Sequence, residues 1–429
     1  MLVEFEVGNY RSFKDPVRLS MVAANPIKEF LEENTFQAWR YRLLKSAAIY
    51  GANASGKSNL LHAMAFMRGF VLSSSKEMQA GEPIRVVPFK FDTATENAPS
   101  RFETSFLLKD RRYRYGFEAD RKAVRKEWLY YAEKQKEEHL FLREEDDIEV
   151  GVDFGEGKTL EEKTRSNALF LSVVAQFNGE TAGMILKWFL DVGLLHGLQD
   201  MQYGGFTASL LQDEALRPRL LDFIQRADVG IENLTVSEKP LDEEALKRLP
   251  EQVQDQIRKQ KPRIAEVSAV HSKFRDGVKE GLATTDFFSE ESDGTKKLFC
   301  IAGPLLESLT SGRVVVLDEL DARLHPLLTK AVVRLFNSSV SNPNNAQLIF
   351  ATHDTNLLDN DMLRRDQIWF TEKTQQGATA LYSLAEMKVR NDASFEKNYI
   401  AGRYGAIPFL GGLAALPMET GDGPSRQIH

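Results

Sequence analysis

The residues whose chemistry is easiest to interpret form a glycine-rich stretch, GANASGKS, at positions 51–58. Gly51, Gly56, Lys57 and Ser58 satisfy every fixed position of the pattern G-x-x-x-x-G-K-[ST]. In that pattern the glycines let backbone N–H groups turn inward on a phosphate, the lysine adds a cation for the β and γ phosphates, and the serine hydroxyl can bind Mg²⁺. A short apolar run precedes the stretch and an amphipathic helical pattern follows it, which argues against a chance turn. The stretch therefore predicts a binding site for a nucleoside triphosphate, with ATP as the default.

Two carboxylates follow a strongly apolar segment in the second half of the chain. Residues 313–319 read RVVVLDE, so a buried strand is expected to end at Asp318 and Glu319. A carboxylate at such an edge can hold Mg²⁺ through water, which assigns Asp318, and the next one can orient the water that attacks the γ-phosphate, which assigns Glu319. The alternative is an ordinary strand that ends in surface acids. The complete phosphate loop upstream favours the catalytic interpretation.

A histidine, His353, ends the next apolar segment, LIFATHD. A lone histidine is more often structural. At this spacing after Asp318 and Glu319, however, its side chain can donate a hydrogen bond to the γ-phosphate and sense whether that group is present. We therefore expect His353 to belong to the same site.

A second anion-binding pattern precedes the apolar helix that starts near residue 298. The segment SEESDGTKK places Ser292 and Gly294 at a helix start, where backbone N–H groups can bind an anion. One nucleotide does not need two phosphate cradles within one subunit. We therefore expect this segment to close over the nucleotide of a second copy, so that two ATP molecules are buried in a two-fold interface. The alternative is an ordinary N-capped helix.

The remaining elements must position these residues around one nucleotide. Strand patterns occur near both ends of the chain, at residues 2–7, 17–22, 46–50, 314–317, 348–351, 368–371 and 379–383. Residues 84–132 also alternate like strands, with a hairpin turn at Asp110, whereas residues 165–265 look mostly helical. The apolar stripe expected on these helices comprises Trp188, Phe189, Leu194 and Leu195. Within the same region the highly charged segment 241–263 predicts a surface helical pair or a mobile arm. We expect one α/β core built from both ends of the chain, with a β-rich part and a helical part inserted.

Composition narrows the class of protein. A chain of 429 residues predicts two or three domains, and a net charge of −7 argues against a protein that coats nucleic acid through bulk charge. The single cysteine, Cys300, excludes an intramolecular disulfide and a cysteine metal cage, which fits a reducing cytoplasm. The sequence shows neither a signal peptide nor an apolar run of about 18 residues, so no membrane association is expected.

The order of these motifs resembles the ABC-type ATPase head of the SMC and RecF group, without room for a long coiled coil. In their detailed sequence, the segments ESDGTKKL, LDELDARLHP and NAQLIFATHDTNLLD are more similar to the AAA-family ATP/GTP phosphatases of abortive-infection and PARIS-type phage defence systems. These are relatives of the overcoming-lysogenisation-defect ATPases. The resemblance is strong over residues 1–70 and 285–411 and weak between them.

The resemblance implies an ABC-type head with a β-rich subdomain and an inserted helical lid. Its parts would be residues 1–164, 165–284 and 285–418, followed by a flexible tail at 419–429. Phosphates and nucleotide would be bound by Gly51, Asn53, Ser55, Gly56, Lys57, Ser58, Asn59 and Arg11. Mg²⁺ would be held by Ser58, Asp318 and Gln176. Glu319 would be the catalytic base, assisted by His353 and Lys57. Ser292, Gly294 and Thr295 would act on the nucleotide of a second copy, and Asp321 would serve the contact between copies.

The same resemblance implies a homo-oligomeric ATP switch that answers a phage-encoded trigger. The nuclease relatives carry a Toprim domain after the ATPase, and too few residues follow His353 to hold one, so we expect any toxic effector to be a separate protein. Two alternatives remain open. One is a DNA-binding repair ATPase that uses the basic stretch 109–127, in which Tyr113 and Tyr115 could stack on bases, although a solvated hairpin explains that stretch as well. The other is a scaffold that uses ATP only to assemble, against which Glu319 argues.

Overall fold

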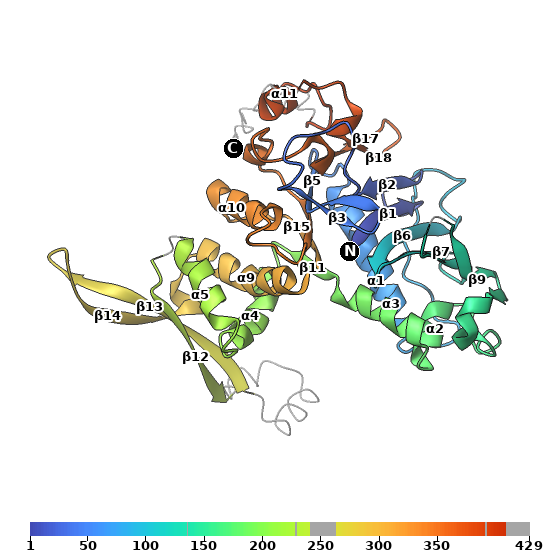
Figure 1. Ribbon diagram of the computed structural model, residues 1–429, viewed down its shortest axis with the longest axis horizontal. Helices are drawn as coiled ribbons and strands as arrows, with labels where there is room; N and C mark the ends of the chain where they lie inside the picture. The colour runs from blue at the N-terminus through green and yellow to red at the C-terminus, as the bar shows by residue number, and fades with distance from the viewer. Residues whose placement is uncertain (135, 228–229, 241–262, 391–392, 409–429) are drawn as a thin grey trace, which may run out of the picture.

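Figure 1 shows the computed structural model, which describes residues 1–134, 136–227, 230–240, 263–390 and 393–408. The predicted charged segment 241–263, apart from its last residue, and the predicted tail 419–429 lie outside the described residues.

A six-stranded sheet, in the order β11-β15-β16-β5-β17-β18, forms the centre of the fold. Its strands are β5 (Ser46–Tyr50), β11 (Gly193–His196), β15 (Val314–Asp318), β16 (Gln347–Ala351), β17 (Ile368–Lys373) and β18 (Thr379–Ser383). Neighbouring strands are parallel, except for the antiparallel pair β17 and β18. All residues of β5, β15 and β16 are buried, as expected for parallel strands covered on both faces. Five of these strands were predicted from the sequence and are confirmed.

The two ends of the chain meet in this sheet. β5, from near the start of the chain, lies between β16 and β17, from near its end. The backbone N–H of Leu2 donates to Oε1 of Gln347 at 2.6 Å, and Nε2 of Gln347 donates back to the carbonyl of Leu2 at 3.0 Å. The predicted α/β core built from both termini is therefore confirmed.

Alternate residues of the central strands enter two separate apolar cores. The helices that cover the sheet are α1 (Lys57–Ser73), α9 (Asp293–Ser311) and α10 (Pro326–Asn337). Ala47 and Ile49 of β5 belong to the core that contains α1, whereas Ala48 and Tyr50 belong to the core that contains α9 and α10. This period-two alternation holds α1 on one face of the sheet and α9 on the other.

A seven-stranded antiparallel sheet covers the outer side of α1 and forms the predicted β-rich part (Figure 1). Its strands are β1 (Leu2–Gly8), β2 (Val17–Ser20), β6 (Ser100–Leu108), β7 (Arg111–Ala119), β8 (Val124–Ala132), β9 (Glu138–Glu144) and β10 (Asp147–Val150). The predicted hairpin at Asp110 is confirmed. Lys109 and Asp110 have φ values of 48° and 59°, which a two-residue turn between twisted strands requires.

The region expected to be mostly helical, residues 165–265, contains strands as well as helices. Its helices are α2 (Phe170–Gln176), α3 (Glu180–Asp191), α4 (Gly204–Leu210) and α5 (Arg217–Arg226). An antiparallel sheet of β12 (Asn233–Pro240), β13 (Arg263–Arg275) and β14 (Val278–Asp286) starts within it and extends past residue 265, before the short helix α8 (Phe287–Glu290). The β13–β14 hairpin projects from the body (Figure 1). Alternation explains β13, since Val267 and Ala269 are buried whereas Glu266, Ser268 and Val270 are only partly buried.

The expected apolar stripe is split between two elements. Trp188 and Phe189 lie on α3, whereas Leu194 and Leu195 belong to β11, which pairs with β15 in the central sheet. The remaining elements are β3 (Thr35–Ala38), β4 (Tyr41–Leu44), α11 (Phe395–Ile400) and the 3₁₀ turns η1 (Val152–Gly157), η2 (Asp200–Tyr203), η3 (Thr355–Leu357), η4 (Arg365–Gln367) and η5 (Leu384–Glu386). None of the helices in the described residues combines the length and apolarity that a membrane span needs. The domain boundaries expected at residues 164, 284 and 418 stay predictions.

Candidate functional site

The loop between β5 and α1 has the backbone shape of a phosphate cradle. Gly56 has a φ of 118°, and a Cβ atom there would lie 2.4 Å from Oγ1 of Thr379, so only glycine fits. α1 begins at Lys57, and among the described residues no side chain caps it. The first backbone N–H groups of α1, together with its helix dipole, are therefore directed at an anion.

Lys57 lies inside this loop. Its Nζ donates to the carbonyls of Gly51 at 2.8 Å and Ala52 at 3.2 Å. Burial lowers the pKa of Lys57, and the nearby carboxylates, led by Asp318, oppose that shift. The ammonium is thus placed between the loop backbone and the carboxylates, where β and γ phosphate oxygens would lie.

The carboxylates at the end of β15 face the loop across a cavity of about 520 Å³. The cavity is lined by residues 53–59 together with Asp318, Glu319, Ala351, Thr352, His353 and Lys373. These residues come from the loop after β5 and from the ends of β15, β16 and β17, because the carboxyl ends of parallel strands meet at one edge of the sheet. The structure therefore brings the predicted phosphate loop, Asp-Glu pair and histidine together.

Asp318 has the features of a cation ligand. Its side chain is almost fully buried, and among the described residues its Oδ1 has no hydrogen-bond partner. An unpaired buried carboxylate oxygen is costly, and a cation would satisfy it. The hydroxyl of Ser58 lines the same cavity. The donor set fits Mg²⁺, which Asp318 and Ser58 would hold and which would neutralise charge on the phosphates.

Glu319 and His353 complete the cavity wall. Glu319 is half-buried and has a φ of 54°, an uncommon conformation for this residue type that turns the chain sharply after β15. The backbone N–H of His353 donates to Oδ1 of Asp321 at 3.2 Å, and the Thr352 hydroxyl donates to the same oxygen at 2.6 Å. Burial, and next the Lys57 ammonium, lower the pKa of His353. Asp321 thus ties the turn after Glu319 to His353, while its role between copies stays a prediction.

This arrangement suits phosphoryl transfer to water. Lys57 and the α1 N-terminus can bind phosphates, Glu319 can accept a proton from the attacking water, and the His353 side chain, which lines the cavity, can contact the terminal phosphate.

The second anion-binding segment predicted from the sequence, Ser292–Thr295, lies outside the cavity of its own subunit. Ser292 caps α9 and accepts a hydrogen bond from the backbone N–H of Thr295 at 3.1 Å. Ser292 is exposed, and neither Ser292, Gly294 nor Thr295 lines the cavity. A nucleotide held by another copy could therefore reach the exposed start of α9, but the role of these residues in trans stays a prediction.

Gln176 does not lie at the site, so its assignment as a metal-linked glutamine is wrong. It is exposed at the end of α2. The hydroxyl of Ser172 in α2 donates to the carbonyl of Val71 at 2.6 Å, which places α2 beside the far end of α1. At 1.5 Å per residue, Val71 lies about 20 Å along the helix from Lys57. Gln176 cannot reach a cation next to Ser58 over that distance.

Arg11 lies beside the phosphate loop. Its Nη1 contacts Oδ1 of Asn59 at 3.4 Å and Nδ1 of His62 at 3.1 Å. The loop is held in place by Ser55, whose Oγ lies 2.6 Å from Oγ1 of Thr371, and by Asn59. Arg11 is exposed and could approach a bound nucleotide, a role that stays a prediction.

His196 occupies the position next to Asp318 and was missed in the sequence. It ends β11 in register with Asp318, and its Nε2 lies 4.0 Å from Oδ2 of that residue. Because Nδ1 accepts a hydrogen bond from the backbone N–H of Leu198 at 3.2 Å, the neutral ring carries its proton on Nε2, facing the carboxylate. The available signal was a short apolar run, GLLH, that ends in a polar residue before a glycine.

The chain is similar to known proteins at the level of family. A family model described as "AAA domain, putative AbiEii toxin, Type IV TA system" matches residues 46–359, well over half of the chain. No curated protein matches it in sequence. A solved SMC head domain from Thermotoga maritima has 14% identity and a TM-score of 0.39, covering 90% of this chain and 99% of that chain. A solved SMC head bound to the C-winged helix domain of ScpA has 14% identity and a TM-score of 0.40, covering 93% and 99%.

Proposed function

Because the chain belongs to the AbiEii-type AAA-domain family of type IV toxin–antitoxin systems, we propose that it is a slowly hydrolysing ATP switch of a bacterial anti-phage defence system. The observation that carries this proposal is the single cavity shared by the phosphate loop, Asp318, Glu319 and His353. ATP, with Mg²⁺ held by Ser58 and Asp318, is the ligand for which this cavity is best equipped.

The active form is a homo-oligomer in which ATP lies between two copies. The phosphate loop of one copy and the Ser292–Thr295 segment of the next would enclose each nucleotide. Support comes from the exposed start of α9, which presents a capped helix N-terminus away from its own cavity. A closed two-fold arrangement places the Ser292–Thr295 segment of each copy over the cavity of the other.

The output of this switch is carried by a separate effector. Binding and hydrolysis of ATP change the arrangement of subunits but make no product that could harm a phage or its host. A phage-encoded trigger would shift the equilibrium between the two arrangements, and a toxic partner, such as a Toprim-type nuclease, would be released or activated. Glu319 disfavours a scaffold that uses ATP only to assemble, because a scaffold needs no base at the γ-phosphate.

The proposed function is tested by measuring ATP turnover per subunit over a range of protein concentrations, with the mass of the particle measured with and without ATP. Turnover per subunit should rise with concentration, and the mass should double or more when ATP is bound. A constant turnover per subunit from a monomer would contradict the shared site. The defence role predicts that the native locus lowers phage plating efficiency, and that Lys57→Ala in this chain abolishes the protection.

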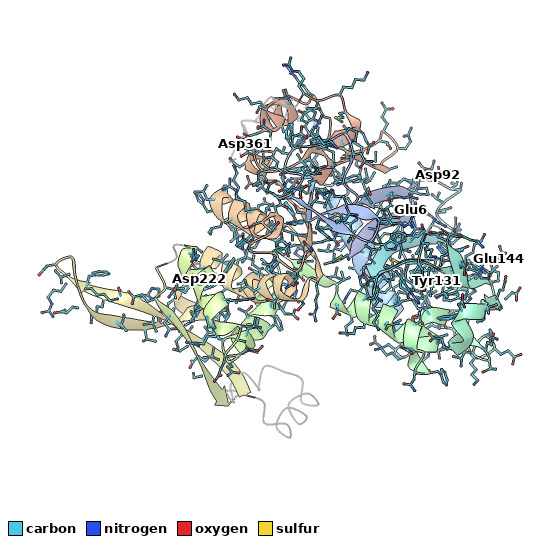
Figure 2. All side chains as sticks on the ribbon, in the orientation of Figure 1. Glu6, Asp92, Tyr131, Glu144, Asp222 and Asp361 are labelled. Atoms are coloured by element: carbon cyan, nitrogen blue, oxygen red, sulfur yellow. The ribbon has the colours of Figure 1, made fainter. Side chains whose placement is uncertain are left out.

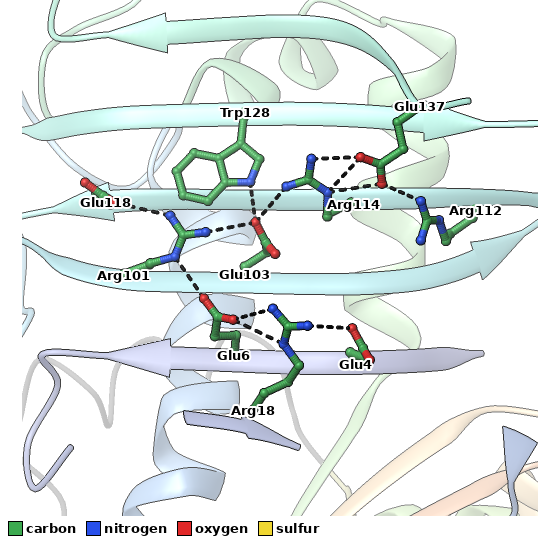
Figure 3. A network of polar contacts seen from close by, with 10 residues as sticks. All are labelled: Glu4, Glu6, Arg18, Arg101, Glu103, Arg112, Arg114, Glu118, Trp128 and Glu137. Carbon is green, nitrogen blue, oxygen red and sulfur yellow. Dashed lines mark hydrogen bonds and ion pairs between the residues drawn. The ribbon is translucent and has the colours of Figure 1, made fainter. Parts of the chain in front are cut away.

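A DNA-binding function is less well supported, because arginines of the basic stretch have carboxylate partners (Figure 3). Within the stretch, Arg114 contacts Glu103 at 3.0 Å and Glu137 at 2.9 Å, and Arg112 contacts Glu137 at 2.5 Å. The neighbouring Arg101 contacts Glu6 at 3.0 Å and Glu118 at 3.1 Å. These residues share the outer face of the seven-stranded sheet, on which Glu6 and Glu144 are marked in Figure 2. The face therefore carries arginines that already have carboxylate partners.

The predicted stacking residues are also out of reach. Tyr113 and Tyr115 are buried, at 3% and 0% exposure, so the expectation that they stack on bases is wrong. Their rings point into the core between the sheet and α1, since alternate residues of β7 face inward.

We expect wild-type protein to bind duplex DNA with a Kd weaker than about 10⁻⁵ M at physiological salt. A fluorescence titration at several salt concentrations measures this. The double variant Glu103→Gln, Glu137→Gln removes carboxylates from Arg112 and Arg114 and should bind more tightly, with a steeper dependence on salt. Tight, salt-dependent binding by the wild type would instead favour the DNA-repair alternative.

A further inference from the structure

The turn that follows Asp318 is held by several elements at once. We call residues 319–323 the Glu319 turn. Before it, the carbonyl of Asp318 accepts a hydrogen bond from the N–H of Gly197 at 2.8 Å. At its end, Arg323 donates to Oδ1 of Asp200 at 2.6 Å. Glu319 and Arg323 have φ values of 54° and 62°, so the turn keeps two residues in uncommon conformations that the surroundings must maintain.

A buried lysine from α9 supplies a further restraint on this turn. Lys297, in the first turns of α9, is fully buried. Its Nζ donates to the carbonyls of Glu319 at 3.0 Å, Leu320 at 3.0 Å and Ala322 at 2.5 Å. An ammonium has three donors, so these three carbonyls use all of them. Burial lowers the pKa of Lys297 to about 8.

The same helix also contacts the turn through its backbone. A Cβ atom on Gly294 would lie 2.9 Å from the carbonyl oxygen of Arg323, so the start of α9 and the end of the turn are already in close contact. A Cβ atom on Gly197 would lie 2.1 Å from the carbonyl oxygen of Glu319 and 2.8 Å from Nζ of Lys297. The Glu319 turn is thus enclosed between α9 and the end of β11 and cannot move independently of them.

We infer that Lys297 is a positioning residue that makes the Glu319 turn move together with the start of α9. Separating them would leave a buried ammonium without acceptors, which is strongly unfavourable. According to the proposed function, on which this step rests, Ser292–Thr295 contacts the nucleotide of another copy. This contact then sets the position of Glu319 in the subunit's own cavity. ATP bound in one site would then influence the position of the catalytic base in the neighbouring site.

The test compares Lys297→Met with wild type for kcat, KM for ATP and ATP-dependent assembly. Lys297 does not line the cavity, so KM should stay within about threefold. Misplacement of Glu319 should lower kcat by about 10- to 100-fold. Lys45→Met is the matched control, because Lys45 is also buried and donates to the carbonyl of Asn337 at 3.3 Å and to Ser339 Oγ at 2.9 Å, far from the cavity. It should keep the wild-type kcat.

A second variant disturbs the same turn without removing the ammonium. Gly197→Ala places a methyl group against the carbonyl of Glu319 and should also lower kcat more than it raises KM. If Lys297→Met does not fold, Gly197→Ala provides the test instead. The inference is overturned if folded Lys297→Met keeps the wild-type kcat, or if Gly197→Ala keeps it when Lys297→Met is unfolded. It is also overturned if both variants lose kcat, ATP binding and melting temperature together.

The outcomes also separate this inference from the proposed function. If wild type forms no ATP-dependent assembly but Lys297→Met still loses kcat at constant KM, the shared site fails and the positioning role stands. If wild type assembles and Lys297→Met keeps its kcat, only the positioning role fails. A sigmoidal dependence of wild-type turnover on ATP that becomes hyperbolic in Lys297→Met would support the coupling between sites.

Discussion

Glu319→Gln should lower kcat for ATP hydrolysis by about 10²- to 10⁴-fold while leaving ATP binding intact. The amide has nearly the same shape as the carboxylate but cannot accept a proton from the attacking water. The restraints on the Glu319 turn act on its backbone carbonyls, so they remain when the side chain changes. Since binding continues without hydrolysis, the variant should accumulate as an ATP-bound assembly. Phosphate release measures the turnover, and light scattering measures the mass.

The control for this change is Glu307→Gln. Glu307 pairs with Arg313 at the opposite end of β15, so the same chemical substitution there tests whether loss of any carboxylate near this strand matters. It should retain kcat within about twofold, because it is remote from the phosphates. Turnover by Glu319→Gln at the wild-type rate would remove Glu319 from the catalytic role and would leave the scaffold interpretation as the better one.

Glu127→Ala should destabilise the protein by about 3–5 kcal/mol, the range expected when one partner of a buried charged network is removed. Glu127 is buried in the seven-stranded sheet and accepts hydrogen bonds from the Tyr115 hydroxyl at 2.9 Å and from the N–H groups of Phe170 and Leu171. Its carboxylate lies 3.8 Å from Nη1 of Arg143, which is itself buried. Burial raises the pKa of Glu127 in spite of this partner. Alanine would leave the buried Arg143 charge without its carboxylate partner and the first N–H groups of α2 without their acceptor.

Denaturant unfolding followed by tryptophan fluorescence measures this effect. Glu144→Ala is the matched control, since Glu144 lies in the neighbouring strand β9 but its side chain is 77% exposed and pairs with Lys126 at 3.4 Å. An exposed pair contributes at most about 1 kcal/mol, so the control should unfold near the wild-type midpoint. Equal midpoints for the two variants would show that the Glu127 network does not hold α2 against the sheet.

The parts of the site that follow a local pattern could be predicted from the sequence. The phosphate loop requires glycines, a lysine and a serine at fixed spacing, and the Asp-Glu pair ends a run of four apolar residues. In the structure these segments line one cavity, because parallel strands bring their carboxyl ends together. The central strands could also be predicted, because fully buried strands appear in the sequence as short apolar runs.

The neighbours of Asp318 could not be predicted in this way. β11 has only four residues and follows α3 almost directly, so its apolar residues continue a helical pattern. Only the strand order shows that His196, rather than Gln176, stands beside the carboxylate. β12 to β14 were missed because their serines, threonines and charged residues hide the alternation. Lys297 gave no signal either, since a lysine in a charged segment usually lies at the surface.

The order of strands in the central sheet also bears on how the protein is made. β5 carries the phosphate loop, yet both of its neighbours, β16 and β17, come from near the other end of the chain. A ribosome therefore releases the loop long before the strands that support it on either side exist. Pairings this distant in sequence are slow to form. The nascent chain can bind nucleotide only after β17 has emerged, so the switch cannot be set until most of the chain has been synthesised.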